Sequence, residues 1–413
     1  MTTPIQLTTE GAAARQTLAD LPDWPLAGAA EAPRGAYLHV PFCFHKCHYC
    51  DFYSIVDARD RRSVFTTRLI EELAFVHGAG HVSAPLEAVF VGGGTPTLLE
   101  PADWTRLLAA MAEYLPGFPG IECTVEANPE TVTPELLKIL AGGGVNRLSI
   151  GAQSFDPRHL KTLERHHDPA TVGRAIAMAR DAGIERVSLD LIFGVPGQTP
   201  ADWRADVDQA LALEPVHLSA YGLMYESGTA LTRRRDLGRI EPIDPDLEAE
   251  MYEHTIDRLG AAGFEQYEIS NWALPGEACR HNLLYWRGRS WWAYGPSAVG
   301  FLADGQAPGG WRWRNLPRLG DYLATGPLPP VVDAERIRPA TARGEAFMLE
   351  LRLTEGMTNA RLDALLAGDP DAERRRAVID EAVGAGQLER RDGSLRFTAA
   401  GRMVADAVLA ELI

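Results

Sequence analysis

The stretch "HVPFCFHKCHYCDFYS", residues 39–54, places three cysteines within eight residues: Cys43, Cys47 and Cys50. The whole chain has only five cysteines among its 413 residues, which is too few for a disulfide framework. Thiolates are preferred ligands of iron–sulfur clusters and of zinc. The three clustered cysteines therefore predict metal or redox chemistry in a reducing compartment.

Two kinds of metal site fit these residue types. A structural zinc ion takes four ligands, which the three cysteines would supply together with His45 or His48. A cubane iron–sulfur cluster has four irons, so three thiolates leave one iron open to an exchangeable ligand. The spacing of the cysteines and the absence of a fourth one favour the iron–sulfur cluster.

From residue 36 onward, short β-rich runs alternate with longer helical segments. The runs are close to continuously apolar, which indicates strands covered on both faces. Six of them begin at Ala36, Leu86, Ile121, Val145, Arg186 and Val216. Six βα repeats predict an α/β protein with a parallel sheet, and a barrel or partial barrel fits better than an open sheet. In either case the reactive groups are expected at the carboxyl ends of the strands.

The pattern changes at both ends of the chain. Residues 1–35 are expected to form a flexible arm, and residues 36–325 the barrel. The proline-rich residues 328–342 are interpreted as a connector. Residues 340–413 predict helices and one hairpin, turning at Asp392 and Gly393, in a small winged-helix-like domain. From Arg343 onward this domain has ten arginines, no lysine and thirteen acidic residues, so a structural or lid role is favoured over nucleic-acid recognition.

The charge and hydropathy of the chain exclude several partners. There are 40 Lys and Arg against 56 Asp and Glu, a formal net charge of −16, which opposes broad contact with nucleic acid or an anionic membrane. No signal-peptide pattern occurs at the N-terminus, and no segment approaches the roughly 18 uninterrupted apolar residues of a membrane span. We expect a cytoplasmic protein that is not an integral membrane protein.

A glycine run, "VGGGTPT", follows the second β-rich run. It consists of Gly92, Gly93 and Gly94 with Thr95. Such a run allows the backbone to approach a ligand closely, although an ordinary tight turn has the same composition. No Lys-Ser or Lys-Thr follows, so it is not a phosphate-binding loop.

Polar residues end the next three β-rich runs or follow them. Glu126 ends the third run, Gln153 the fourth and Asp190 the fifth, and Arg165 follows Gln153 by twelve residues. A carboxylate such as that of Glu126 can accept hydrogen bonds from a ribose, and it can also simply cap a helix.

The stretch "YLHVPFCFHKCHYCDF" closely resembles the radical S-adenosylmethionine (SAM) superfamily, and within it the HemN/HemW branch. The resemblance implies a [4Fe–4S] cluster held by Cys43, Cys47 and Cys50, with SAM on the open iron. In this superfamily an electron from the cluster cleaves SAM to a 5′-deoxyadenosyl radical. The implied fold is a partial (β/α)6 barrel, which agrees with the six repeats.

The same resemblance implies the residues that bind SAM. Gln153, Arg165 and Asp190 correspond to a second SAM site that the branch can hold, while His166 and His167 are expected on a loop surface. The full implied set is Tyr37, Gly92, Gly93, Gly94, Thr95, Glu126, Gln153, Arg165 and Asp190.

The segment "HNLLYW", His281 to Trp286, lies among aromatic residues and turn-forming glycines. On composition alone, His281 would be a hydrogen-bonded residue in a loop that covers the core. The segment resembles the HNxxYW signature of the HemW family, in which this histidine is a candidate haem ligand. Imidazole ligates haem iron, and aromatic walls suit a porphyrin. The resemblance implies haem as a partner, an acceptor protein for it, and an electron donor such as a flavodoxin or ferredoxin.

Three functions remain open from the sequence. They are a haem chaperone that carries a SAM-ligated cluster, an oxygen-independent coproporphyrinogen III oxidase, and a related radical SAM methyltransferase. The oxidases carry a further cysteine two residues after the third one, where this chain has Phe52. That departure argues against oxidase activity, and "HNLLYW" favours the haem chaperone over the methyltransferase.

Overall fold

The computed structural model describes residues 17–20, 31–305 and 308–413. Most of the expected N-terminal arm lies outside the described residues. Within it, Leu18–Asp20 forms a short 3-10 helix, η1, and Thr17 pairs with Pro330 in an isolated β-bridge.

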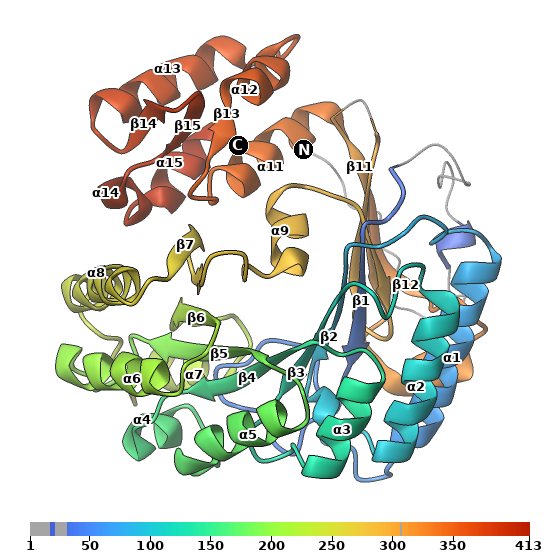
Figure 1. Ribbon diagram of the computed structural model, residues 1–413. Coiled ribbons are helices and arrows are strands. Elements are labelled where there is room, and N and C mark those ends of the chain that lie inside the picture. Colours follow the sequence, from blue (N-terminus) through green and yellow to red (C-terminus); the bar gives the residue numbers. More distant parts are fainter. Residues whose placement is uncertain (1–16, 21–30, 306–307) are drawn as a thin grey trace.

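Six parallel strands lie side by side in the order of the chain (Figure 1). This is the order expected of a partial barrel, and it confirms the predicted fold. The strands are β1 (Gly35–Val40), β2 (Ala88–Gly93), β3 (Glu122–Ala127), β4 (Arg147–Gln153), β5 (Arg186–Phe193) and β6 (His217–Gly222).

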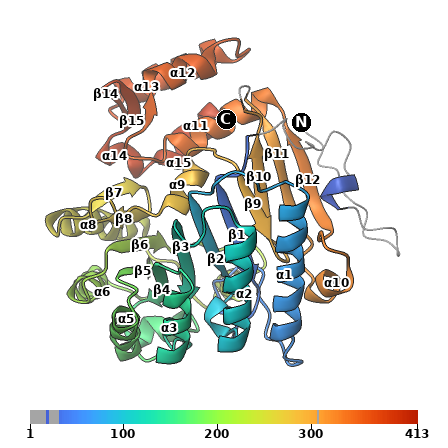
Figure 2. The ribbon, with the colours of Figure 1, turned by 45° about the vertical axis from the view of Figure 1, so that its right-hand side comes forward.

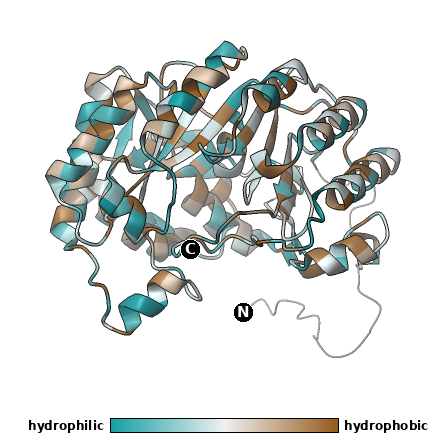
Figure 3. Cartoon of the chain, turned by 90° about the horizontal axis from the view of Figure 1, so that it is seen from below, coloured by the Kyte–Doolittle hydropathy of each residue, from teal (hydrophilic) through white to brown (hydrophobic). Residues whose placement is uncertain are grey.

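Helices between these strands form an outer layer, and Figure 3 shows them as an arc around the strands. Several begin with proline in the first turn, and Thr133, Asp156 and Thr199 cap helices with their side chains, as expected for residues that accept from free backbone N–H groups. The helices are α1 (Arg62–Gly78), η2 (Pro96–Leu98), α2 (Pro101–Tyr114), α3 (Pro134–Gly142), α4 (Pro157–Thr162), α5 (Ala170–Asp181) and α6 (Pro200–Ala212).

The barrel strands are not apolar on both faces, so that part of the interpretation was wrong. Along β3, Cys123 and Val125 belong to the hydrophobic core with the outer helices, whereas Glu122, Thr124 and Glu126 alternate with them. Successive side chains of a strand point to opposite faces, so the second set faces the interior of the barrel. The interior of the barrel is therefore lined by polar as well as aromatic side chains, and we call this interior the channel.

The sheet extends beyond the six predicted strands at both edges (Figure 2). The segment interpreted as a connector contains β12, whose residues pair antiparallel with β11, so that interpretation was also wrong. Beyond β1 lie β9 (Trp291–Tyr294), β10 (Val299–Ala303), β11 (Gly310–Asn315) and β12 (Val331–Ile337), and beyond β6 lie β8 (Asn271–Ala273) and β7 (Glu265–Glu268).

Four further helices connect these outer strands. They are α7 (Ala230–Asp236), α8 (Pro245–Ala261), α9 (Arg280–Trp286) and α10 (Leu319–Ala324). Within the described residues, no helix combines the length and the apolar character that a bilayer crossing requires.

The C-terminal segment forms a second hydrophobic core around Phe347, Ile379 and Leu395. It contains a three-stranded sheet of order β13-β15-β14 and packs near α9, at the end of the barrel opposite to the carboxyl ends of β1–β6 (Figure 1). It is therefore not a lid over those ends. Its elements are α11 (Pro339–Glu350), β13 (Met357–Thr358), α12 (Asn359–Leu366), α13 (Ala372–Gly384), β14 (Leu388–Arg391), β15 (Ser394–Phe397), α14 (Ala399–Arg402) and α15 (Ala405–Leu412).

A buried carboxyl group joins the barrel to its outer strands. Glu72 of α1 accepts a hydrogen bond from the Tyr322 hydroxyl at 2.7 Å and one from the Gly295 N–H at 3.2 Å. Burial raises the pKa of the Glu72 carboxyl from its ordinary value of 4.5 to about 7. Folding therefore favours the protonated form of Glu72.

We predict that Glu72 makes the protein less stable as the pH rises from 4.5 to 7. Below 4.5 the group is protonated in both the folded and the unfolded chain. Between 4.5 and 7 only the unfolded chain releases the proton, so the stabilisation is lost over this window. The melting temperature, measured against pH for the wild type and for Glu72→Gln, should fall more steeply for the wild type, by roughly a few degrees. Parallel curves for the two proteins would contradict this assignment.

Candidate functional site

The three clustered cysteines lie in a loop directly after β1. The loop closes on itself because the Cys43 N–H donates to the Ile55 carbonyl at 2.9 Å and the Ile55 N–H donates to the Pro41 carbonyl at 2.7 Å. The cysteines are therefore carried by a bounded loop at the carboxyl end of the first barrel strand. We call residues 43–50 the cysteine loop.

An aromatic side chain anchors the cysteine loop in the protein. Tyr49 packs against a small hydrophobic cluster that includes Leu163, Ile192 and Leu231. The Leu231 N–H of α7 also donates to the His48 carbonyl at 2.8 Å. These contacts fix the loop against β5 and α7, and they explain why a large apolar residue lies between two cysteines.

The three thiols are free and partly accessible. Burial raises the pKa of the Cys43 thiol and raises that of Cys50 to about 11. Their sulfur atoms do not all lie within 4.8 Å of one another, whereas Zn–S bonds of about 2.3 Å place sulfurs roughly 3.8 Å apart in a tetrahedron. A cubane spreads its thiolates because each binds a different iron. The donor set fits an iron–sulfur cluster better than zinc.

The two histidines of the zinc alternative turn toward another residue. His45 Nε2 lies 3.7 Å from Glu164 Oε2, and His48 Nδ1 lies 3.7 Å from Glu164 Oε1. Both imidazoles thus face the loop after α4. This arrangement argues against a closed site of three cysteines and one histidine.

The glycine run lies against the start of the cysteine loop. The Gly94 N–H donates to the Val40 carbonyl at 2.8 Å, and the Thr95 N–H donates to the Phe42 carbonyl at 2.7 Å. A Cβ on Gly94 would lie 2.6 Å from the Phe42 carbonyl oxygen, a separation that real side chains do not adopt. Glycine is required here because the two backbones touch.

Glu126 connects this run to the interior channel. One of its carboxylate oxygens, Oε2, accepts from the Gly93 N–H at 2.9 Å. Burial raises the pKa of the Glu126 carboxyl to about 7, and the nearby Asp190 adds to the shift. A Cβ on Gly92 would come within 2.7 Å of Glu126 Oε2. The carboxylate therefore borders the glycine backbone directly.

Asp190, Arg165 and Gln153 surround the neighbouring part of the channel. Asp190 accepts a hydrogen bond from Ser149 at 2.9 Å, and burial raises the pKa of its carboxyl. Arg165 donates to the Gly151 carbonyl at 2.6 Å and lies 3.8 Å from the Cys47 sulfur. Gln153 has a positive φ of 64° at an irregularity of the pairing between β4 and β5, a local conformation that costs energy and often marks functional sites.

The structure thus gathers the sequence-predicted residues around the carboxyl ends of β1–β5, with one exception. Tyr37 lies deeper in the channel, where its hydroxyl is 3.0 Å from His39 Nδ1. His281 is the exception, because α9, the helix that carries it, lies at the opposite end of the barrel, beneath the C-terminal segment (Figure 1).

His281 is buried in α9, with 2% of its surface exposed. Its ring stacks on Phe90 and Tyr37, and Nε2 shares a hydrogen bond with the Tyr285 hydroxyl at 2.8 Å. Its Nδ1 is buried with no hydrogen-bond partner, and burial lowers the pKa of the ring to about 3. The imidazole is neutral, which is the form that binds iron, but aromatic rings enclose it.

Sequence reasoning missed several residues of the channel. Burial lowers the pKa of His39 to about 4, and its ring nitrogen Nε2 contacts the Tyr53 carbonyl at 2.8 Å. Ser149 supports Asp190 as described above, and Tyr285 holds His281. Strict alternation of polar and apolar residues within β1 and β4 was the available signal for His39 and Ser149. No local pattern distinguishes Tyr285 from the other aromatic residues of its segment.

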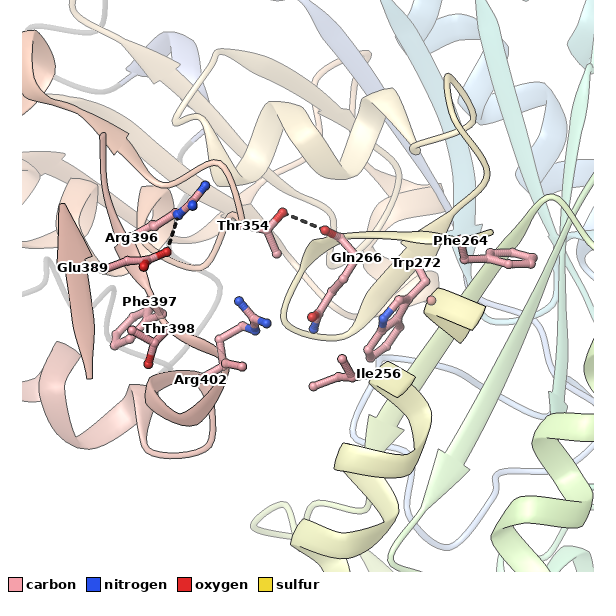
Figure 4. Close-up of a pocket in the computed structure, with 12 residues that line it drawn as sticks. Ile256, Phe264, Gln266, Trp272, Thr354, Glu389, Arg396, Phe397, Thr398 and Arg402 are labelled. Carbon is pink, nitrogen blue, oxygen red and sulfur yellow. Dashed lines mark hydrogen bonds and ion pairs between the residues drawn. The ribbon is translucent and has the colours of Figure 1, made fainter. Parts of the chain in front are cut away.

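A cavity of about 380 Å³ lies elsewhere, between the barrel edge and the C-terminal segment. In Figure 4 its labelled side chains come from both sides of this junction. Thr354 donates to the Gln266 carbonyl at 2.6 Å, and Arg396 pairs with Glu389 at 2.8 Å. None of the lining residues belongs to the cysteine loop or the glycine run. The cavity is a feature of the domain junction.

Sequence comparisons match this arrangement. The Radical SAM superfamily model covers residues 37–210, and the HemN C-terminal domain model covers residues 337–404. A Mycobacterium tuberculosis protein named heme chaperone HemW is 40% identical over 97% of this chain and 99% of its own length. The Escherichia coli protein of the same name is 33% identical over 91% of this chain and 97% of its own length.

A solved structure shares the fold. The Escherichia coli coproporphyrinogen III oxidase HemN, titled a radical SAM enzyme, superposes with a TM-score of 0.79 over 94% of this chain and 91% of that one, at 19% identity. At that identity the likeness concerns the fold alone. The full-length relatives, together with the cysteine loop and the partial barrel, show that this chain belongs to the HemW family of radical SAM proteins.

Proposed function

We propose that this protein is a haem chaperone that binds haem for transfer to an acceptor protein and carries a SAM-ligated [4Fe–4S] cluster. The proposal rests on one observation: the same chain contains the cysteine loop, which packs on the glycine run, and the helix with the sequence "HNLLYW". Relatives along almost its whole length are named heme chaperones.

Membership of the radical SAM superfamily implies a [4Fe–4S] cluster and SAM. Cys43, Cys47 and Cys50 would hold the cluster, which supplies an electron for reductive chemistry on SAM when both are bound. Because burial raises the pKa of the Cys43 and Cys50 thiols, cluster assembly must release protons from them.

Residues of the channel would hold SAM. The backbone of Gly92, Gly93 and Gly94 with Thr95 offers N–H and C=O groups next to the cysteine loop, and Glu126 offers a carboxylate beside them. Further into the channel, hydrogen-bonding side chains lie at the strand ends. They are Tyr37, Gln153, Arg165 and Asp190.

Haem would bind through His281. In the described conformation Glu122 holds the start of α9, since its carboxylate accepts from the Arg280 N–H at 2.7 Å. The ring of His281, which is buried and stacks on Phe90 and Tyr37, would have to become accessible before it could bind haem iron. The aromatic side chains around His281 would suit the flat, apolar face of a porphyrin.

Phe52 argues against a coproporphyrinogen III oxidase, the second candidate. Its side chain is 64% exposed beside the cysteine loop, at the position where the oxidases carry a cysteine. A methyltransferase, the third candidate, has no residue of this chain in its favour beyond the shared SAM site.

The remaining partners follow from the same proposal. We propose a cytoplasmic protein, because free thiols and an iron–sulfur cluster suit a reducing compartment. A flavodoxin or ferredoxin would supply the electron. The acidic balance of the chain opposes nucleic acid as a partner.

We predict one oxygen-sensitive cluster per chain with about four irons. Serine at position 43, 47 or 50 should abolish iron binding after anaerobic reconstitution, because a hydroxyl is a hard, poor ligand for iron–sulfur clusters. Cys123→Ala and Cys279→Ala serve as controls and should keep full iron and sulfide content. Stoichiometric zinc without labile sulfide in the wild type would overturn the cluster assignment.

Glu126 should make SAM binding depend on pH. Its carboxyl pKa of about 7 in the free protein means that the charged acceptor forms as the pH rises through 7, so SAM affinity should rise over the same range. Glu126→Gln should weaken binding by about tenfold or more, since a hydrogen bond to a charged group contributes roughly 1.5–3 kcal/mol. It should also flatten the pH dependence. Calorimetric titration on cluster-loaded protein measures both effects, and loss of iron in the variant would contradict the role.

His281→Ala should shift or weaken the haem spectrum of the purified protein because it removes an axial nitrogen. Tyr285→Phe is the matched control, since it removes the partner of Nε2 and keeps the aromatic packing. It should retain haem. An unchanged haem spectrum in His281→Ala would show that the histidine packs against its neighbours and does not bind haem iron.

Coproporphyrinogen III, incubated anaerobically with reductant and cluster-loaded protein, should remain unconverted because Phe52 replaces the cysteine of the oxidases. Chromatographic detection of the divinyl product would show that the protein is a coproporphyrinogen III oxidase and would contradict the chaperone proposal.

A further inference from the structure

Three histidines and one glutamate meet beside the cysteine loop. Glu164 Oε2 lies 3.7 Å from His45 Nε2 and 3.9 Å from His166 Nε2, and its second oxygen lies 3.7 Å from His48 Nδ1. We infer that His45, Glu164 and His166 form a second metal site, separate from the cluster, which takes a free divalent first-row cation such as Zn²⁺, with His48 against the second oxygen of Glu164.

The donor types and their spacing suit such an ion. Imidazole and carboxylate bind zinc at about 2.0–2.2 Å, which places neighbouring donors roughly 3.4 Å apart. The donor atoms of His45, Glu164 and His166 all lie within 4.8 Å of one another. A small contraction of the two loops brings them to binding distance. The side chains remain accessible, with 42% of His45 and 65% of His166 exposed, so an ion can reach them from solvent.

Ordinary hydrogen bonding does not account for the group. Separations of 3.7–3.9 Å exceed those of a hydrogen bond, and one carboxylate faces three imidazoles. His48 Nδ1 is buried from solvent and has no hydrogen-bond partner. A cation between His45, Glu164 and His166 would give these three donors a shared partner.

Another group with a similar composition is explained without a metal. Asp156, His159 and Asp202 also lie close together. Asp156 and Asp202 accept from backbone N–H groups at the starts of α4 and α6 and pair with Arg158. The carboxylate of Glu164, in contrast, pairs only with histidines and with no arginine or lysine among the described residues.

The donor atoms of His45, Glu164 and His166 lie close together, which argues against haem iron as the occupant. A haem iron is reached only along the axis of the porphyrin, from above or below its plane. Three donors from two loops, all within a few ångströms of each other, would require the ring to pass through the loops. The site therefore suits a bare ion.

The ion would join two loops that both border the cluster. His45 and His48 belong to the cysteine loop, and Glu164 and His166 follow α4. Arg165 lies between the latter two, and its side chain lies 3.8 Å from the Cys47 sulfur. A bound cation would thus hold the cysteine loop against the segment that carries Arg165.

The test measures zinc by equilibrium dialysis and elemental analysis on tag-free, full-length protein. A triple serine variant at positions 43, 47 and 50 removes competing thiols. It should bind one Zn²⁺ per chain. Adding His166→Ala or Glu164→Gln should weaken zinc binding by at least about tenfold, as expected when a metal loses a ligand. His77→Ala, an exposed histidine on α1, is the matched control and should bind like the parent.

The cluster-loaded wild type gives an independent measurement, since it should hold one zinc in addition to its irons. Absence of zinc in both proteins would overturn the inference, as would zinc binding that is indifferent to His166 and Glu164. Haem binding that needs these histidines, without zinc binding, would also overturn it. None of these readouts depends on haem transfer or on SAM, so the site can fail while the proposed function stands.

Discussion

The backbone of the glycine run contacts the backbone at the end of β1, and this contact constrains the positions of the surrounding site residues. Gly94 and Thr95 donate to the carbonyls of Val40 and Phe42, at separations that leave no room for a side chain on Gly94. This contact fixes where the cysteine loop leaves β1. It also places Glu126 next to the glycine backbone. Asp190 lies near Glu126, and Arg165 lies near the Cys47 sulfur, so the polar side chains of the channel have a defined position relative to the cysteines.

Most of the barrel could be predicted because six β-rich runs alternate with capped helices. Two parts could not. The polar residues of β3 and its neighbours were absorbed into apolar runs, since a partial barrel leaves its inner face open to polar groups where an open parallel sheet buries both faces. The segment containing Val331–Ile337 looked like a connector because prolines flank it, but prolines before a strand are compatible with an edge position.

The candidate site was predictable where its chemistry requires one particular residue type. Cysteines at a special spacing and three successive glycines have few ordinary explanations. His281 shows the opposite case, since "HNLLYW" does not reveal that α9 turns inward and buries the ring between Phe90 and Tyr37. His167 was expected on a surface and is buried instead, whereas His166 is exposed as expected. Composition does not encode this difference between two adjacent histidines.

The strand at the outer edge of the sheet has a consequence for self-association. An unpaired edge presents N–H and C=O groups to which a strand of another chain can add. On β12, Asp333 and Glu335 lie about half and one-third exposed and form ion pairs with Arg314 and Arg312 of β11. Adding a foreign strand there would bring charged side chains close to its own and strip water from them. The charges thus disfavour edge-to-edge aggregation along this part of the sheet.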